Sequence, residues 1–366
     1  MPRTALAEKL ADEGLPLKNY RGADTVEVFS DPRDEFEAVR SSTGVYDLGW
    51  RSKIVLTGND RVRWLNGMVT NNVRDLSVNR GVYSFVLNAQ GRILGDLYAY
   101  NRGEYLLVDT DRCQLEPMRE LFDKFIIMDD VELTRIDDKL SGIGLAGPGA
   151  NEILADITRE HALFTNGLEP LQVFDTTWAI NFGYSIVRSD FPLVPAYELW
   201  LAPEHIGTVW NRLTISGATP VGFEALELLR VAAGIPRYGT DIRDRDLPQE
   251  TEQQRALNFN KGCYVGQEIV ERIHSRGAVH RMFTGFKFAQ EQLPPPGSKI
   301  QADGKEVGEI TSVATVPCDG GQGYVALGYI RREAGTPGKT VDVAGVPAVV
   351  TAPPLLEASV PSTQKS

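Results

Sequence analysis

The most constraining feature of the sequence is the run GVYSFVLNAQGRILGDLYAYNRGEYLLVD, from Gly81 to Asp109. It alternates through three short apolar stretches, which are broken at Asn88–Gly91 and at Asn101–Gly103. Alternation with a period of two is typical of strands with one buried face, and asparagine with glycine supplies the backbone conformations of tight turns. The run therefore predicts an antiparallel β-meander.

Flanking patterns add further elements to this meander. A strand is expected from about Trp50 to Thr57, and a helix after Asp60, where apolar residues recur at helical spacing. Another helix is expected from about Leu115 to Phe125. The run GFEALELLRVAAGIPRYG predicts a strong helix that Gly234 and Pro236 bring to an end.

The run GIGLAG matches the dinucleotide fingerprint G-x-G-x-x-G at Gly142, Gly144 and Gly147. The stretch before it is a poor candidate for a buried parallel strand, and Pro148-Gly149 follows at once. Because the fingerprint needs a strand before it and a helix opening at its glycines, the context favours a different structure. We predict a glycine-rich strand-to-helix turn before ANEILADI, with no dinucleotide site.

The C-terminal part has the pattern of a separate β unit. With 366 residues the chain is too long for one ordinary core, so two or three domains are expected. After LPPPG at 293–297, strand-like runs alternate with glycine turns, which predicts a small all-β domain. The final EASVPSTQKS is polar and is expected to be disordered.

Composition excludes several classes of protein. A net charge of −11 argues against nucleic acid bound by bulk electrostatics. The sequence has no apolar run long enough for a transmembrane helix and no apolar core of a signal peptide at its N-terminus. We therefore expect the protein in the cytoplasm. Three cysteines lie far apart and the histidines lack metal spacing, so neither a disulfide framework nor a protein metal site is expected.

One of these cysteines, Cys263, lies in the unusual stretch NKGCYVGQEIVERIH. Because Val265, Ile269 and Ile273 recur every four residues, we predict a helix with Cys263 at or just before its first turn. Free backbone N–H groups there would favour a thiolate and lower the pKa of the thiol, with help from Lys261. The alternative is that Cys263 is a small buried hydrophobic residue.

The residues after Cys263 include a histidine and several basic side chains. His274 follows eleven residues later, roughly 16 Å along a helix, so a cysteine–histidine catalytic pair within this helix is excluded. The segment ERIHSRGAVHR is basic, although Glu268 and Arg272 form an i,i+4 pair. It is either a solvated face or a docking surface for a carboxylate-rich ligand or partner.

The stretch KGCYVGQE, from Lys261 to Glu268, is similar to the signature of the YgfZ branch of the folate-binding GcvT superfamily, which includes the glycine cleavage T protein. AVRSSTGVYDLGWRSKIVLTG, GIGLAGPGANEIL and LLRVAAGIPRYGTDI also resemble that family. The resemblance implies an α+β, three-domain cloverleaf with tetrahydrofolate, or a one-carbon-substituted folate, in a central cavity. It implies a folate-binding region over residues 1–280, made of two interleaved, chain-discontinuous lobes with the meander lobe at about 50–130. A β-barrel over 281–355 and a disordered tail over 356–366 complete the expected organisation.

The resemblance also implies roles for residues of the meander. GRILGDL matches the T protein's G-G-x-x-D-D-L, so Asp96 falls on the second aspartate, placed near the reactive nitrogens of folate, and Gly95 replaces the first. In EYLLVD, Leu107 and Asp109 fall on folate-contact positions. Asp96 is thereby expected to be both a catalytic and a cofactor-binding residue.

Further roles follow outside the meander. Tyr184 and Glu198 match the ends of the family's G-Y-T-G-E-x-G-x-E, although this chain is longer between them and lacks the T-G-E core. Glu198 is the expected pterin-binding carboxylate, because one carboxylate can accept two hydrogen bonds from an amino-pyrimidinone edge. Arg230 resembles an anchor near the ligand. The alternative for Glu198 and Asp96 is a carboxylate on the surface of a strand.

Three functions are compatible with this sequence. The YgfZ branch implies a folate-binding protein that supports assembly or repair of iron–sulfur enzymes, including tRNA-modifying ones, with Cys263 and Lys261 as functional residues and iron–sulfur client proteins as partners. The second is a tetrahydrofolate-dependent aminomethyl or one-carbon transferase, in which Asp96 steers the one-carbon unit. The third is a non-catalytic folate sensor. None of them requires direct nucleic-acid or membrane contact.

Overall fold

The computed structural model describes residues 2–158, 167–178, 182–277, 279–289, 291–318 and 321–356. The predicted meander forms β5, β6 and β7 of a five-stranded sheet, and this prediction is confirmed. The strand order is β5-β6-β7-β4-β8, and every pairing in the sheet is antiparallel. The strands are β4 (Arg51–Thr57), β5 (Arg80–Leu87), β6 (Ile93–Asn101), β7 (Leu106–Asp111) and β8 (Glu132–Arg135).

Helices α3 (Arg61–Met68) and α4 (Arg112–Phe125) belong to the same lobe. Trp64, Met118 and Phe122 pack with the apolar side chains of the strands in one core. Side chains alternate between the two faces of a strand, and the residues of β4 and β7 that face away from this core include charged ones. This second surface is turned toward the rest of the molecule and contributes to the site.

A second lobe is built on a six-stranded sheet with the order β10-β11-β12-β9-β3-β13. Neighbouring strands are antiparallel except for β13 and β3. Helices α1 (Ala5–Lys9), α5 (Ala150–Thr158) and α7 (Ile206–Ile215) pack on one face of it. The strands are β3 (Gly44–Asp47), β9 (Ser141–Ala146), β10 (Val173–Trp178), β11 (Phe182–Arg188), β12 (Ala196–Leu201) and β13 (Thr219–Val221). The chain leaves this sheet after β3, builds the five-stranded lobe, and returns at β9.

The run GIGLAG forms β9 and the turn after it. Gly147 has a φ of 133°, and a Cβ added there would lie 2.3 Å from the carbonyl oxygen of Ser42. Helix α5 begins at Ala150. The predicted strand-to-helix turn is therefore confirmed, and glycine is required because the backbone of the preceding segment passes so close.

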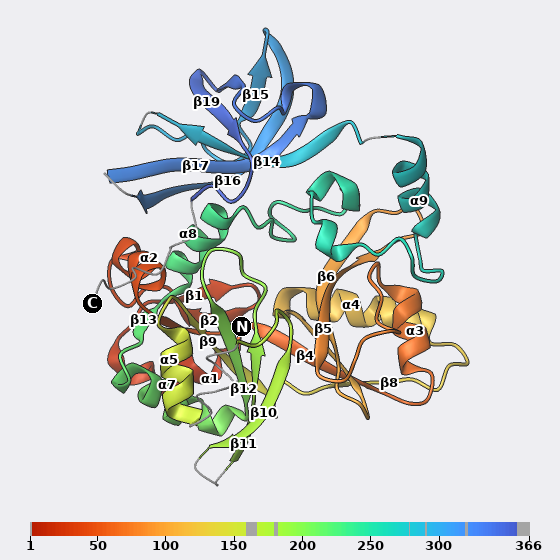
Figure 1. The fold of residues 1–366 in the computed structure, drawn as a ribbon, viewed down its shortest axis with the longest axis vertical. Coiled ribbons are helices and arrows are strands. Elements are labelled where there is room, and N and C mark those ends of the chain that lie inside the picture. The colour runs from red at the N-terminus through yellow and green to blue at the C-terminus, as the bar shows by residue number, and fades with distance from the viewer. Residues whose placement is uncertain are drawn as a thin grey trace.

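The C-terminal all-β prediction is also confirmed. Six strands close into a barrel in the order β14-β17-β16-β15-β18-β19, which lies at the top of Figure 1. They are β14 (Arg281–Phe288), β15 (Lys299–Ala302), β16 (Lys305–Cys318), β17 (Gly321–Arg331), β18 (Thr340–Val343) and β19 (Val346–Thr351). Phe286, Ile310 and Ile330 are among the side chains that fill it. Of the expected tail, residues 357–366 lie outside the described part of the chain.

The remaining elements connect these three bodies. Helix α8 (Phe223–Ala233) ends at Gly234, which adopts a φ of 73°, as the sequence predicted. It packs between α2 (Pro32–Ser41) and the barrel strand β16, while the hairpin of β1 (Leu17–Tyr20) and β2 (Ala23–Val26) lies beside it in Figure 1. Helix α9 (Gln267–Arg276) lies on the side of the five-stranded lobe. Among the described residues, no helix is long and apolar enough to span a bilayer.

Asp241, which is fully buried, fastens α8 to the barrel. Its Oδ2 accepts hydrogen bonds from Arg230 Nη1 (2.7 Å) and the backbone N–H of Arg237 (2.9 Å). Its Oδ1 accepts from the hydroxyls of Ser312 (2.7 Å) and Thr311 on β16. One carboxylate therefore joins α8 and the stretch that follows it to β16, some 70 residues further along the chain.

We expect Asp241→Asn to lower the free energy of unfolding by about 3 kcal/mol, because it removes the nearer and more deeply buried of the two carboxylates that pair with the buried Arg230 cation. Urea unfolding followed by circular dichroism measures the change. The matched control is Asp244→Asn, an exposed neighbour, which should change the unfolding free energy by less than about 0.5 kcal/mol. Equal losses in the two variants would contradict the proposed fastening role.

Candidate functional site

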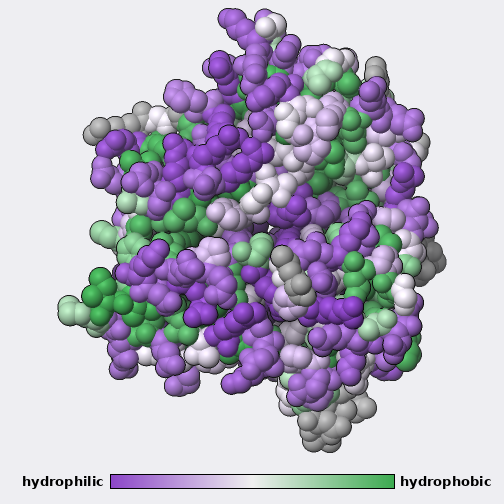
Figure 2. All heavy atoms as spheres, turned by 180° about the vertical axis from the view of Figure 1, so that it is seen from behind, coloured by the Kyte–Doolittle hydropathy of each residue, from purple (hydrophilic) through white to green (hydrophobic). Residues whose placement is uncertain are grey.

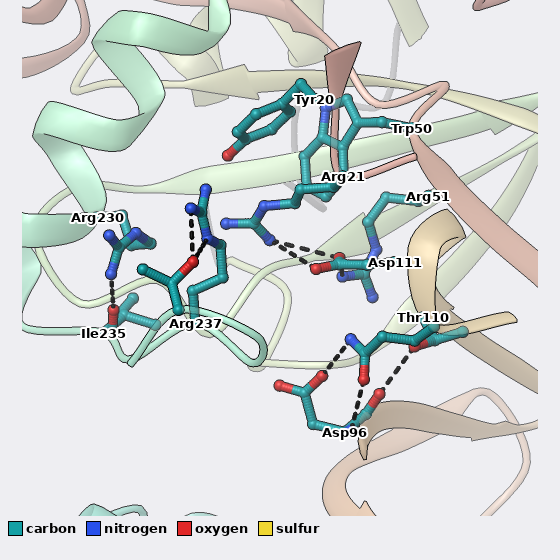
Figure 3. A network of polar contacts seen from close by, with 12 residues as sticks. Tyr20, Arg21, Trp50, Arg51, Asp96, Thr110, Asp111, Arg230, Ile235 and Arg237 are labelled. Atoms are coloured by element: carbon teal, nitrogen blue, oxygen red, sulfur yellow. Dashed lines mark hydrogen bonds and ion pairs between the residues drawn. The ribbon is translucent and has the colours of Figure 1, made fainter. Parts of the chain in front are cut away.

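A cavity of about 190 Å³ lies where the two sheets and α8 meet. Its lining residues come from segments as distant as β1, β6 and the stretch after α8. Figure 3 shows how they face one another, with Tyr20, Arg21 and Trp50 above, Arg230 and Arg237 at one side and Asp96 below. The site is thus assembled by tertiary structure and does not lie on one local motif.

One wall of the cavity is aromatic and cationic. The Arg21 guanidinium lies over the Tyr20 ring (5.0 Å to the centroid) and the Trp50 ring (4.7 Å). It also forms an ion pair with Asp111 at 3.2 Å. A flat, partly polar ligand would meet aromatic faces here together with fixed charges.

Asp96, which was expected to be a catalytic and folate-binding residue, lines this cavity. Its Oδ2 accepts a hydrogen bond from the Tyr83 hydroxyl at 2.6 Å, and its Oδ1 accepts one from Gln114 Nε2 at 2.7 Å. Burial and then the nearby Asp111 carboxylate raise the pKa of Asp96, while those hydrogen bonds act in the opposite direction. Asp96 is therefore a positioned carboxyl group whose proton affinity is increased.

Strands β4 and β7 place opposite charges in register next to the cavity. Arg51 pairs with Asp111 and Lys53 with Asp109 across the two strands. Asp109 Oδ1 accepts hydrogen bonds from Arg51 Nε (3.2 Å) and Lys53 Nζ (3.3 Å). Its buried Oδ2 has no hydrogen-bond partner in the part of the chain that the structure describes. This unused acceptor is unusual, because buried polar atoms are nearly always satisfied.

Glu198 on β12 lies beside the same charged group. Its Oε2 accepts a hydrogen bond from Trp200 Nε1 at 2.7 Å. Burial and then Asp109 raise the pKa of Glu198, while Lys53 and Arg51 lower it by a smaller amount. Neither Glu198 nor Asp109 belongs to the cavity lining, but Arg51, which contacts Asp109, does. The two carboxyl groups therefore lie outside the lining, behind Arg51.

The other predicted ligand residues are placed differently. Leu107 packs in an apolar cluster with Tyr100 and Trp200. Tyr184 lies in the core between the six-stranded sheet and its helices, together with Leu199. Because Glu198 and Leu199 point to opposite faces of β12, the structure does not bring Tyr184 to the cavity. Tyr184 was matched through a motif whose central residues are missing from this chain.

Arg230 lines the cavity, yet its donors are directed to protein acceptors. Its guanidinium donates to Glu227 Oε2 (3.0 Å), Ile235 O (2.8 Å), Asp241 Oδ2 (2.7 Å) and Ser312 Oγ (2.9 Å). These bonds use four of the five N–H groups that an arginine carries. The geometry therefore supports a structural role in the cavity wall, and its role as a ligand anchor stays a prediction.

Glu227 is the centre of the cationic wall. It accepts a hydrogen bond from the Tyr20 hydroxyl (2.7 Å) and forms ion pairs with Arg21 (3.4 Å), Arg230 (3.0 Å) and Arg237 (2.9 Å). Burial alone would raise the pKa of Glu227, but the three arginines and the Tyr20 hydroxyl bring it down to about 2. The carboxylate is therefore charged throughout the ordinary pH range and holds the arginines in place.

Cys263 is exposed to solvent and does not belong to the cavity lining. Helix α9 begins at Gln267, so the prediction that Cys263 lies at or just before the first helical turn is wrong. The turn at Gly266 (φ of 82°) separates them, and Val265 packs into the core of the five-stranded lobe. The apolar spacing that predicted one helix therefore spans a buried turn residue and the helix after it.

Lys261 fixes the segment that carries this cysteine. Its buried Nζ donates hydrogen bonds to the carbonyl oxygens of Asn66 (2.6 Å), Asn71 (2.7 Å) and Val69, at the end of α3. Asn71 Nδ2 in turn donates to the carbonyl oxygen of Arg255 (2.8 Å), a residue of the cavity lining. Burial lowers the pKa of Lys261 to about 7, while three carbonyl acceptors favour its charged form. Lys261 is a positioning residue that ties the cysteine segment to the five-stranded lobe.

The basic segment after Cys263 is largely paired with carboxylates. Arg281 contacts Asp246 (2.6 Å) and Glu250 (2.9 Å), and Arg272 contacts Glu268 at 2.6 Å. The exposed Arg272–Glu268 pair matches the predicted solvated face. Arg281 instead ties β14 to the 3₁₀ helix at Pro248–Thr251.

Sequence reasoning missed several residues of the cavity wall. Arg21 and Arg237 lie in a turn and an irregular segment, and Arg255 lies in the short 3₁₀ helix Gln254–Ala256, where an arginine has no distinctive local pattern. The sequence did contain a signal for Arg51. Basic residues alternate in R-S-K (51–53) and acidic residues alternate in D-T-D (109–111), and the two stretches pair in register in neighbouring strands. Such a match in two neighbouring strands indicates a buried ion-pair face.

Comparison with known proteins places the chain among relatives of similar length. Residues 16–261 match the family model of the GCVT N-terminal domain, and residues 279–358 match that of the CAF17 C-terminal β-barrel domain. An aminomethyltransferase from Streptomyces coelicolor is 28% identical over 358 residues, 94% of each chain. A putative chloroplastic transferase from Arabidopsis thaliana is 27% identical over 320 residues, 87% of this chain and 72% of the relative.

The same architecture occurs in a solved structure. The glycine cleavage system aminomethyltransferase T from Bartonella henselae has a TM-score of 0.85 at 21% identity. The match covers 97% of this chain and 98% of that one. The expected α+β fold with its C-terminal barrel is thereby confirmed.

We expect Glu227→Gln to lower the free energy of unfolding by about 3 kcal/mol near pH 7, because a pKa of about 2 lies well below the ordinary value of 4.5. A lowered carboxyl pKa stabilises the fold above pH 4.5, and this contribution is lost as the pH falls toward 2. The difference between wild type and variant should therefore shrink over that interval in urea unfolding.

Glu37→Gln, at an exposed position of α2, is the control and should show no such dependence. A constant difference between wild type and Glu227→Gln from pH 7 down to pH 3 would contradict the assignment.

Proposed function

Because the chain belongs to the GCVT N-terminal domain family, as a YgfZ-like protein with a CAF17-type barrel, we propose that it binds a reduced folate in the central cavity and supports iron–sulfur enzymes through Cys263. The clients include enzymes that modify tRNA. The single observation that carries folate binding is the cavity itself. It combines aromatic walls and Asp96, and the carboxyl groups of Asp109 and Glu198 lie just outside its lining.

The chemistry of a pterin fits the charged groups of Glu198, Asp109 and Arg51. Its amino-pyrimidinone edge carries N–H donors and a carbonyl acceptor, so it needs a carboxylate and a cation close together. Glu198 and Asp109 can accept hydrogen bonds from a ligand, and Asp109 Oδ2 has no hydrogen-bond partner among the described residues. Arg51 can donate a hydrogen bond. Burial and the neighbouring Asp109 raise the pKa of Glu198, so donors from a ligand would stabilise its charged form.

Asp96 supports a role near the reacting nitrogens. Tyr83 and Gln114 hold its carboxyl group in one orientation, and its raised pKa favours uptake of a proton. A carboxyl group of this kind can accept a proton from a folate nitrogen and return it without moving. This role serves both the storage of a one-carbon folate and its turnover.

The exposed thiol supports a role at the protein surface. Four cysteines are the usual ligands of an iron–sulfur cluster, so one cysteine does not hold a cluster permanently. As a transient ligand, the Cys263 thiol releases its proton to solvent and binds one iron of a client cluster, without a change of oxidation state. Lys261 keeps the segment in place for that encounter.

A second candidate function is folate-dependent aminomethyl transfer. It is favoured by the names of the relatives from Streptomyces coelicolor and Bartonella henselae and by the position of Asp96 in the cavity. The reaction would take place inside the cavity and would not need an exposed thiol. The two functions therefore make opposite demands on Cys263.

We expect tetrahydrofolate to quench the intrinsic fluorescence of the purified protein on binding, because Trp50 lies in the cavity wall. Glu198→Gln should weaken binding by about 10–100-fold, the usual effect of losing hydrogen bonds to a charged group. The control Glu152→Gln, at an exposed position of α5, should bind like wild type. No signal at high micromolar tetrahydrofolate would contradict the cavity assignment.

We expect Cys263→Ser to lose most of its ability to restore iron–sulfur enzyme activity in cells that lack the wild-type protein. The reason is that serine keeps the size of the side chain but is a poor iron ligand. Sulfur-modified nucleosides of tRNA, measured by mass spectrometry, give the readout. Cys318→Ser should restore them fully, and both variants should bind tetrahydrofolate like wild type.

Full restoration by Cys263→Ser would contradict the thiol role. Turnover of an aminomethyl donor with tetrahydrofolate, abolished by Asp96→Asn and unaffected by Cys263→Ser, would establish the second candidate instead.

A further inference from the structure

The loop between α4 and β8 carries large apolar side chains into solvent. Met128 is 94% exposed, Ile127 is 83% exposed and Phe125 is 41% exposed. In Figure 2, apolar surface protrudes at the left edge of the back view, on the side where α3, α4 and β8 lie in Figure 1. Apolar side chains that cluster in this way outside the core usually mark an interaction site.

The loop is held in this position from both ends. Trp64 Nε1 of α3 donates a hydrogen bond to the carbonyl oxygen of Phe125 at 3.1 Å. At the far end, Asp129 pairs with Arg63 (2.5 Å), and the backbone N–H of Asp130 donates to Asp60 Oδ2 (3.0 Å). Because its ends are fastened, the apolar tip is presented outward and does not fold back onto α3.

The same helix also holds the segment of the reactive cysteine. The backbone N–H of Val265 donates to the carbonyl oxygen of Gly67 at 3.0 Å, and Lys261 binds the carbonyl oxygen of Asn66. Trp64 and Gly67 are three positions apart, about one helical turn. The apolar loop and Cys263 are therefore mounted on one short helix, on one side of the molecule in Figure 1.

The surroundings of the loop specify the chemistry of its partner. The stretch DKFIIMDD carries three aspartates and one lysine around the apolar residues, in a chain whose net charge is −11. Arg63 pairs with Asp129, so Asp123 and Asp130 are the carboxylates left to attract a basic partner. A complementary surface has an apolar centre and basic side chains around it. A standard protein interface covers about 800 Å² on each partner, which is wide enough to span α3, roughly 12 Å long.

We propose that the loop from Phe125 to Met128 is the docking anchor of the iron–sulfur client protein, which meets it with a basic-rimmed apolar patch and thereby presents its cluster to Cys263. The proposal rests on the proposed function of Cys263. It follows from the position of the thiol: Cys263 is exposed and lies outside the cavity lining, so its reaction partner arrives from solution. The loop supplies the apolar contact that such an encounter needs.

The test is the double variant Ile127→Ser/Met128→Ser in cells that lack the wild-type protein. Sulfur-modified nucleosides of tRNA should fall about tenfold, the typical effect of removing central interface side chains. Binding of tetrahydrofolate and the rate of Cys263 alkylation by a small maleimide should both stay at wild-type values. The matched control is Ile215→Ser, which removes an exposed isoleucine (78%) from α7 on the other lobe.

The single variant Met128→Ser, at the more exposed of the two positions, guards against a folding defect and should show a smaller loss in the same direction. If the double variant restores the nucleosides fully while Cys263→Ser does not, the docking proposal is overturned and the role of the thiol stands. If Ile215→Ser causes an equal loss, the loop has no special role and the proposal is again overturned. If Cys263→Ser itself restores the nucleosides, the proposed function fails first.

Discussion

The pairing of buried arginines with carboxylates is the constraint on which the rest of the structure depends. An arginine does not lose its proton inside a protein, so each one that borders the cavity requires a counter-charge in a fixed place. Glu227 and Asp241 supply most of it, and they join the β1–β2 turn, α8 and the barrel. The walls of the cavity are therefore positioned before any ligand arrives, which lowers the cost of ordering them on binding.

The structure gives Asp96 and Cys263 very different surroundings. Asp96 is enclosed, aligned by neighbours and raised in proton affinity. Cys263 is exposed, and a rigid support holds its segment without surrounding the sulfur. A ligand in the cavity and a molecule at the exposed cysteine would therefore not compete for the same space.

Much of the fold could be predicted from the sequence, because its signals are local. The meander, the helix that ends at Gly234 and the glycine turn at Gly147 each follow from spacing and backbone preference within a few residues. The start of α9 was missed because Val265, although in phase with the helix, packs into the core of the five-stranded lobe from the turn that precedes the helix. Glu227, Arg21 and Arg237 were missed for a different reason: their role depends on partners that lie up to 207 residues away in the chain.

A short series of hydrogen bonds connects the cavity lining to the segment that carries Cys263. Arg255 borders the cavity, its carbonyl oxygen accepts a hydrogen bond from Asn71 Nδ2, and the carbonyl oxygen of Asn71 accepts one from Lys261 Nζ, two residues before the cysteine. If a ligand moved Arg255, these two bonds would carry the movement to the cysteine segment. Binding at one of the two places would then change the affinity at the other by the same factor in both directions.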